Sequence, residues 1–142
     1  AFETGARRGN ILRLEWVDVN LGRKTALLRA IKNSRSPDRI IDHEIGLTPR
    51  AAEILETLPR TDDRVFPITP NALRLAFNRA RRNAAVEHFR IHDTRHERVS
   101  SLFEANWSRM QVMAQTGHKD PKSVKRYTKI SGGYLADALA AL

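Results

Sequence analysis

The feature that most constrains the fold is a change of pattern at Thr48-Pro49. Before it, Thr25 to Ile31 and Ile40 to Leu47 have the composition and the polar/apolar alternation that are typical of strands. After it, apolar residues recur at the spacing of amphipathic helices, and Thr48-Pro49 has the cap and first-turn proline of a helix start. Such a chain is restricted to a small N-terminal sheet followed by helices.

Local start and stop signals predict the connections of the N-terminal part. Residues 7 to 15 are predicted to form a short helix, from which 16 to 20 lead out. Leu21-Gly22 indicates a turn. Residues 33 to 39 hold Ser, Pro, Asp and Asn, which predicts a long loop joining the two strands into an antiparallel hairpin.

The remainder is predicted to be a series of helices, which makes the class α+β, mainly α-helical, with a small antiparallel sheet packed against a helical core. Helices are expected from Thr48-Pro49, from Thr69-Pro70, around Arg95, over 109 to 115, from Asp120-Pro121 to near residue 127, and over 134 to 142. In the first two, one apolar face is expected to hold Ala51, Ile54, Leu55 and Leu58, and then Leu73, Ala76, Phe77, Ala80 and Ala84. The third is expected to carry His92, Arg95, Val99, Leu102 and Phe103.

Charge separates this chain from an average globular domain. Its 142 residues suit one domain, and 25 Lys and Arg against 16 Asp and Glu give a net charge of +9. A polyanion such as nucleic acid is the natural partner, although a merely basic protein or an anionic membrane surface would also fit. The absence of cysteine excludes disulfides, thiolate zinc sites and a Cys nucleophile. No apolar run approaches a membrane span, and no signal peptide is visible.

Three segments carry residue types that suit phosphodiester chemistry. They are Thr4-Gly5-Ala6-Arg7, His92-Asp93-Thr94-Arg95, and Gly117-His118 with Tyr127 nine positions later. Two guanidinium forks match the oxygens of one phosphate and stabilise its charge in a transition state. Histidine hydrogen-bonds a phosphate or transfers a proton near neutral pH. Tyrosine serves as a covalent nucleophile.

The order and spacing of these segments resemble the catalytic domain of the tyrosine recombinase (phage integrase) family, from Thr4 to about Tyr127. The resemblance implies that Arg7 and Arg95 clamp the scissile phosphate. It implies that His92 assists proton transfer and orders the phosphate, and that His118 donates a hydrogen bond to a phosphate oxygen.

The same resemblance implies that Tyr127 is the nucleophile, which takes the 3′-phosphate and releases a 5′-hydroxyl. Ile31-Lys32-Asn33 resembles the hairpin segment that carries the family's lysine, so Lys32 is the expected general acid, with Lys24 as a nearby competitor. No metal, ATP or other cofactor is implied. The expected activity is site-specific DNA recombination, without a distinction between integration, excision, resolution and transposition.

This sequence also departs from the family pattern. Asn10 stands where the family usually has Glu or Asp, and an amide supplies no negative charge to the arginine cluster. The family's separate core-binding domain and a first catalytic-domain helix do not precede Thr4-Gly5. We therefore expect residues 1–142 to be the catalytic domain alone, with reduced activity in isolation.

Several alternatives stay open at this point. His92 and His96 are spaced as a metal pair, but no third ligand is apparent. A type IB topoisomerase or a DNA-binding module without activity would use similar residues. A cluster of helical arginines either contacts the DNA backbone or forms a solvated face: Arg74, Arg79, Arg81 and Arg82.

The expected partners follow from the same resemblance. They are double-stranded DNA and further copies of the chain, with the apolar helix of 134 to 142 as the contact between copies, and no membrane partner is expected. The expected location is cytoplasmic, at the nucleoid of a bacterial cell, with a bacterial or phage origin.

Overall fold

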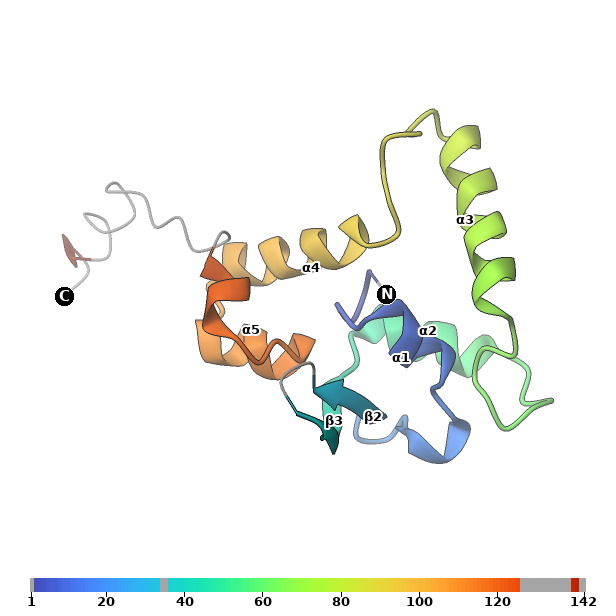
Figure 1. Cartoon of the computed structure of the whole chain (residues 1–142), viewed down its shortest axis with the longest axis horizontal. Helices are drawn as coiled ribbons and strands as arrows, with labels where there is room; N and C mark the ends of the chain where they lie inside the picture. Colours follow the sequence, from blue (N-terminus) through green and yellow to red (C-terminus); the bar gives the residue numbers. More distant parts are fainter. Residues whose placement is uncertain (1, 34–35, 126–138, 141–142) are drawn as a thin grey trace.

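A computed structural model describes residues 2–33, 36–125 and 139–140 of the chain (Figure 1). Within these ranges it contains five α-helices and one antiparallel sheet with the strand order β1-β2-β3. The prediction of a mainly helical α+β domain with its sheet near the N-terminus is confirmed. None of the helices in the described ranges is long and apolar enough to cross a membrane.

The sheet is larger than the sequence predicted. Its strands are β1 (Val19–Asn20), β2 (Thr25–Asn33) and β3 (Ser36–Gly46), and β1 was not predicted. The prediction of a long loop over 33 to 39 is wrong, because strand pairing continues to Asn33 opposite Ser36. β3 is an edge strand, where a proline such as Pro37 is tolerated, and the pairing register shifts near this point. The polar/apolar alternation predicted for residues 44 to 47 is confirmed, because Ile45 and Leu47 are buried.

One hydrophobic core lies between the sheet, α1 (Arg8–Leu12) and α2 (Pro49–Thr57). The first helix is shorter than predicted, because Leu14 leaves the helix and its carbonyl accepts a hydrogen bond from the amide of Val65, at 2.9 Å. The buried members of this core are Ala6, Leu14, Ala26, Leu28, Ile45, Leu47, Ala51, Leu55 and Val65.

The start of α2 is as predicted, with the Thr48 side chain accepting a hydrogen bond from the amide of Ala51 at 3.1 Å. Ile54, however, was predicted to face inward and is 38% exposed. It lines an apolar pocket of about 250 Å³ together with residues of this core. The helical pattern therefore identified the apolar face of α2 but did not show that Ile54 on this face is exposed.

The next helix, α3 (Pro70–Asn83), stands apart from the sheet and buries none of its residues (Figure 1). Its Thr69 cap is as predicted, with a hydrogen bond of 3.1 Å from the amide of Ala72. The predicted inward face is wrong for its alanines at 76, 80 and 84, which are exposed, while Leu73 and Phe77 are half-buried. An amphipathic pattern predicts an apolar face, but it does not supply the element that covers this face.

A second core joins α4 (Asp93–Glu104) and α5 (Arg109–Thr116) through Val99, Leu102 and Val112. Ser108 caps the start of α5 and forms a capping box with Gln111. α5 lies below α4 and beside the β2–β3 hairpin, with contacts to both (Figure 1). Asp120-Pro121 starts a short 3₁₀ helix, η2 (Pro121–Ser123). α5 thus connects the N-terminal sheet to α4, and the candidate site lies where these elements meet.

Candidate active site

Arg95 is the centre of the predicted site, and the protein holds its guanidinium from two directions. Its side chain projects from α4 and the residue is only 4% exposed. Nη1 donates to the carbonyl oxygen of Gly5 and to that of Thr116, the latter at 2.8 Å. Since Gly5 and Thr116 are far apart in the sequence, Arg95 fastens the N-terminal turn to the end of α5. Both bonds go to backbone, so the position of the charge is set by the fold.

Gly5 has to be glycine for two reasons. Its φ of +67° lies in the left-handed region, and a Cβ there would meet Cγ2 of Thr116 at 3.0 Å. The preceding Thr4 is buried, and its hydroxyl accepts a hydrogen bond from the amide of Ala6 at 3.2 Å. The Thr-Gly pair therefore folds a tight turn against α5, and this turn leads directly to Arg7.

Arg7 differs from Arg95 in its surroundings. It occupies the N-cap position of α1, where its carbonyl accepts hydrogen bonds from the amides of Asn10 and Ile11 at 2.9 and 3.2 Å. Its residue is exposed, and in the part of the chain that the structure describes its guanidinium has no hydrogen bond or ion pair. Arg7 thus offers a cation to solvent a few residues from the carbonyl that Arg95 binds.

Asn10, the departure from the family pattern, is buried at 7% exposure. Its Oδ1 accepts a hydrogen bond from the guanidinium of Arg13 at 3.0 Å. The amide at this position therefore supports the end of α1 rather than pairing with Arg7.

His118 lies against the Arg95 guanidinium. Nη2 of Arg95 is 3.2 Å from Nδ1 and 3.1 Å from Nε2 of the imidazole. The Thr116 hydroxyl donates to the carbonyl of Val112 at 2.6 Å and lies 2.7 Å from Nδ1 of His118. A hydroxyl has one proton, so the Thr116 hydroxyl is left to accept a hydrogen bond from Nδ1–H of His118. The structure therefore brings Arg95 and His118 together.

The turn that presents His118 is built on a second glycine in the left-handed region. Gly117 has a φ of +70° and ends α5, with its amide donating to the carbonyl of Met113 at 2.9 Å. A Cβ on Gly117 would meet the ring of His43 at 3.4 Å. The left-handed conformation turns the chain back toward Arg95.

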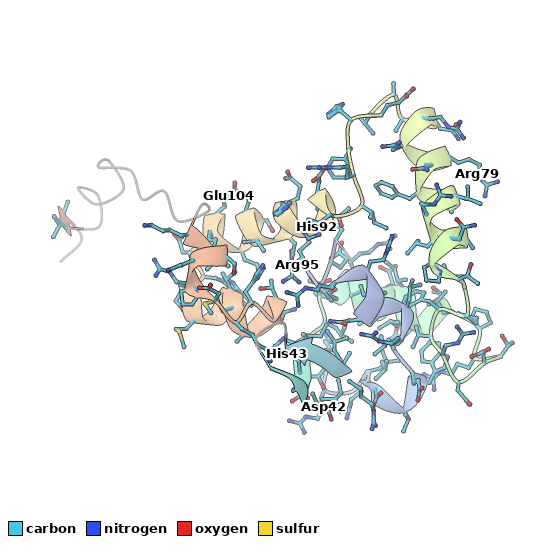
Figure 2. All side chains as sticks on the ribbon, in the orientation of Figure 1. Asp42, His43, Arg79, His92, Arg95 and Glu104 are labelled. Carbon is cyan, nitrogen blue, oxygen red and sulfur yellow. The ribbon has the colours of Figure 1, made fainter. Side chains whose placement is uncertain are left out.

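His43 is a residue that the sequence reasoning missed. It lies on β3, and Figure 2 places it on the other side of Arg95 from His92. Burial lowers the pKa of the His43 imidazole, the carbonyls of Gln115 and Ala114 oppose this, and the charges of Lys119 and Arg95 lower it further. A signal existed, because position 43 lies on the same face of β3 as the buried Ile45.

His92 is placed at the start of α4 rather than within it, one turn before Arg95. Its side chain is exposed and makes no capping hydrogen bond, and its ring contacts the edge of His96 at a centroid distance of 4.6 Å. Among the described residues, no group of three His, Asp or Glu side chains gathers around this pair. Asp93 pairs with Arg90, at 3.3 Å, and the Arg90 amide lowers the pKa of Asp93.

The structure describes the other predicted site residues only in part. The backbone of Lys32 lies in β2 opposite Ile40. Lys24 lies in the turn at the opposite end of β2, with a φ of +53°. Tyr127 and most of the apolar C-terminal segment lie outside the described residues.

The arginines of α3 do not form one uniform surface. Arg81 is half-buried and its Nη1 donates to the carbonyl of Glu87 at 2.7 Å, so it holds the loop after the helix. The guanidinium of Arg74 contacts Asn71 on its own helix. Arg79 and Arg82 are exposed.

Comparison with known proteins identifies the family. The sequence profile of the Phage integrase family matches residues 1–132. The chain belongs to the phage integrase family. The family resemblance predicted from the Arg, His and Tyr motifs is thereby confirmed.

Individual integrase-family relatives agree in sequence and fold. The shufflon-specific DNA recombinase of Escherichia coli is 32% identical over 99% of this chain and 36% of the relative. The catalytic domain of bacteriophage HP1 integrase has a TM-score of 0.71 at 18% identity, over 98% of this chain and 76% of that chain. A Tn1549 transposon integrase in complex with a circular intermediate DNA has a TM-score of 0.76 at 12% identity, over 99% of this chain and 56% of that one. The chain spans between 32% and 39% of the length of the curated relatives that it matches.

Proposed function

We propose that this chain is the catalytic domain of a site-specific DNA recombinase, which cleaves and rejoins strands through a covalent 3′-phosphotyrosyl intermediate without metal or ATP. The observation that carries the proposal is the buried Arg95, held by the carbonyls of Gly5 and Thr116 and in contact with His118. A buried cation fixed at the meeting point of three separate segments is expensive to retain, and it suits a site that binds a phosphate.

In the proposed reaction the Oη atom of Tyr127 attacks the scissile phosphorus. The new O–P bond replaces the bond to the 5′-oxygen, which leaves with a proton from Lys32. Arg7 and Arg95 neutralise the equatorial oxygens, His118 donates a hydrogen bond to one of them, and His92 accepts the phenol proton. Attack by a 5′-hydroxyl reverses these steps and rejoins the strand, so the phosphodiester energy is conserved.

The proposed partners are double-stranded DNA and further copies of the chain. The net charge of +9 supports DNA binding, as does the match to a transposon integrase whose structure contains DNA. The apolar segment of 134 to 142 is our proposed contact between copies, and we place the activity at the bacterial nucleoid. We propose no membrane partner.

The experiment that tests this function starts from a duplex that the protein selects from a random-sequence DNA pool. A nick placed near the cleavage position traps the intermediate, because the short 5′-hydroxyl fragment diffuses away. We expect a protein–DNA adduct that survives denaturation, that forms in the presence of a chelator, and that is absent in Tyr127→Phe although this variant still binds the duplex. Binding without any adduct in the parent would instead indicate a DNA-binding module, and relaxation of supercoiled DNA without a site preference would indicate a topoisomerase.

A further inference from the structure

The side chain of Gln115 bonds to two segments that are distant in the sequence. The amide of Gly46 donates to Oε1 of Gln115 at 2.9 Å, and Nε2 of Gln115 donates back to the carbonyl of Gly46 at 2.9 Å. Nε2 also lies 3.4 Å from the carbonyl of Thr4. Gln115 is on α5, Gly46 is the last residue of β3, and Thr4 begins the turn that leads to Arg7.

This pairing imitates a strand. β3 is the edge of the sheet, so the backbone groups of Gly46 that point away from β2 have no strand partner. A primary amide has an acceptor and two donors, and it can therefore pair with both backbone groups of Gly46 and reach a further carbonyl. Glutamate has the same shape as glutamine but cannot donate. The geometry thus uses the side-chain amide itself, not merely a polar group.

The three joined segments lead to three of the proposed catalytic residues, Arg7, Lys32 and His118. Thr4 leads to Arg7, and Gly46 pairs with Thr25 at the open end of the β2–β3 hairpin, whose other end carries Lys32 opposite Ile40. Gln115 immediately precedes the Thr116-Gly117-His118 turn. A second contact supports the same junction, because the ring of His43 on β3 packs at Gly117.

We propose that Gln115 is a positioning residue, which holds the hairpin of Lys32 in place relative to the turns of Arg7 and His118. The inference rests on the proposed function, since it assumes that Lys32 protonates the leaving 5′-oxygen. We therefore expect loss of Gln115 to impair the protonation of the leaving group more than the attack by Tyr127.

A sulfur substitution separates these two steps. In a duplex with a bridging 5′-phosphorothiolate at the mapped cleavage position, Tyr127 attack breaks a P–S bond and releases a thiolate. A thiol has a pKa of about 8.5, so its thiolate leaves without a proton from a general acid. Cleavage rates on the oxygen and sulfur duplexes are measured for the parent, Lys32→Ala, Gln115→Glu and Gln115→Leu in the intact protein.

Gln111→Leu is the matched control. Gln111 lies on the same helix and its side chain accepts a hydrogen bond from the amide of Ser108 at 2.8 Å, so its loss weakens α5 without touching β3. We expect Lys32→Ala to lose at least about 100-fold on the oxygen duplex and to regain nearly the parent rate on the sulfur duplex. We expect both Gln115 variants to lose about 10-fold on oxygen and to recover on sulfur, and Gln111→Leu to be slowed equally, if at all, on both.

The outcomes distinguish this inference from the proposed function. Equal slowing of the Gln115 variants on both duplexes, as for Gln111→Leu, would overturn the positioning role while Lys32→Ala still recovers on sulfur. Failure of Lys32→Ala to recover would overturn the general-acid role and, with it, the inference. Absence of any parent adduct would overturn the proposed function itself. If Gln115→Leu does not fold, the isosteric Gln115→Glu decides.

Discussion

The two arginines of the candidate site are held in opposite ways. Arg95 is buried at the junction of α4, α5 and the N-terminal turn, where backbone carbonyls and His118 fix its guanidinium. Arg7 begins α1 on the surface, and within the described ranges no side chain or backbone group pairs with its guanidinium. The comparison teaches that one half of the site is assembled by folding, whereas the other half presents its charge to solvent and to any phosphate that arrives.

The largest expected effect is on the assembled half. In Arg95→Ala the carbonyls of Gly5 and Thr116 lose their donor, and each buried carbonyl without a partner costs about 1–3 kcal/mol. We expect the free energy of unfolding to fall by roughly 3 kcal/mol, measured by urea denaturation. Arg90→Ala, which removes an exposed partner of Asp93 at the start of the same helix, should cost under about 1 kcal/mol. Equal losses in the two variants would show that Arg95 is not a structural centre.

The next effect tests the turn that connects the two halves. Gly5→Ala puts a Cβ into the left-handed region and 3.0 Å from Thr116, so we expect a loss of roughly 2–3 kcal/mol in the free energy of unfolding. Gly9→Ala is the matched control, because nothing lies within 4 Å of its added Cβ and the residue is inside α1. This control should gain roughly 0.5–1 kcal/mol from its helix propensity. Similar behaviour of the two glycines would contradict the tight packing of the Thr4-Gly5 turn on α5.

His43 gives the assembled half a dependence on pH. Its pKa is lowered from 6.5, mainly by burial, so below that pH the unfolded chain takes up a proton more readily than the folded chain. The stability that depends on a neutral His43 is therefore fully present above about pH 6.5, and it is lost as the pH decreases toward the pKa of His43 in the folded chain. We expect the Tm to drop between pH 7 and pH 5 in the parent and to drop less in His43→Gln. His88→Gln, at an exposed loop position, should keep the dependence of Tm on pH that the parent shows. If His43→Gln also keeps it, His43 is not the source of the pH dependence.

The elements that the sequence predicted well are those with local signals. Thr48-Pro49 and Thr69-Pro70 start helices because a threonine cap and a following proline act within one turn. The strand pairing of Ser36 was missed because Pro37 and its neighbours are typical of loops, and only the edge position of β3 makes them compatible with a strand.

Long-range placement was less accessible to sequence reasoning. The ordered motifs predicted Arg7, Arg95 and His118 as site residues, and the folded chain brings Arg95 and His118 into contact. Gln115 has no such pattern: its partners Gly46 and Thr4 lie 69 and 111 residues away, and only the folded chain brings them together. α3 shows another limit of sequence reasoning. The apolar periodicity predicted the helix correctly, but it did not show whether another element would cover the apolar face.

The smallest effect on stability, and the sharpest contrast with Arg95, is expected for Arg7→Ala. An exposed guanidinium without protein partners in the described ranges should change the free energy of unfolding by no more than about 0.5 kcal/mol. If Arg7 neutralises a phosphate, the same variant should reduce the slope of log binding constant against log salt by about 1 on the selected duplex. Arg23→Ala, an exposed arginine in the turn before β2, should leave that slope unchanged. A marked loss of stability with an unaltered slope would reverse the comparison and make Arg7 a structural residue like Arg95.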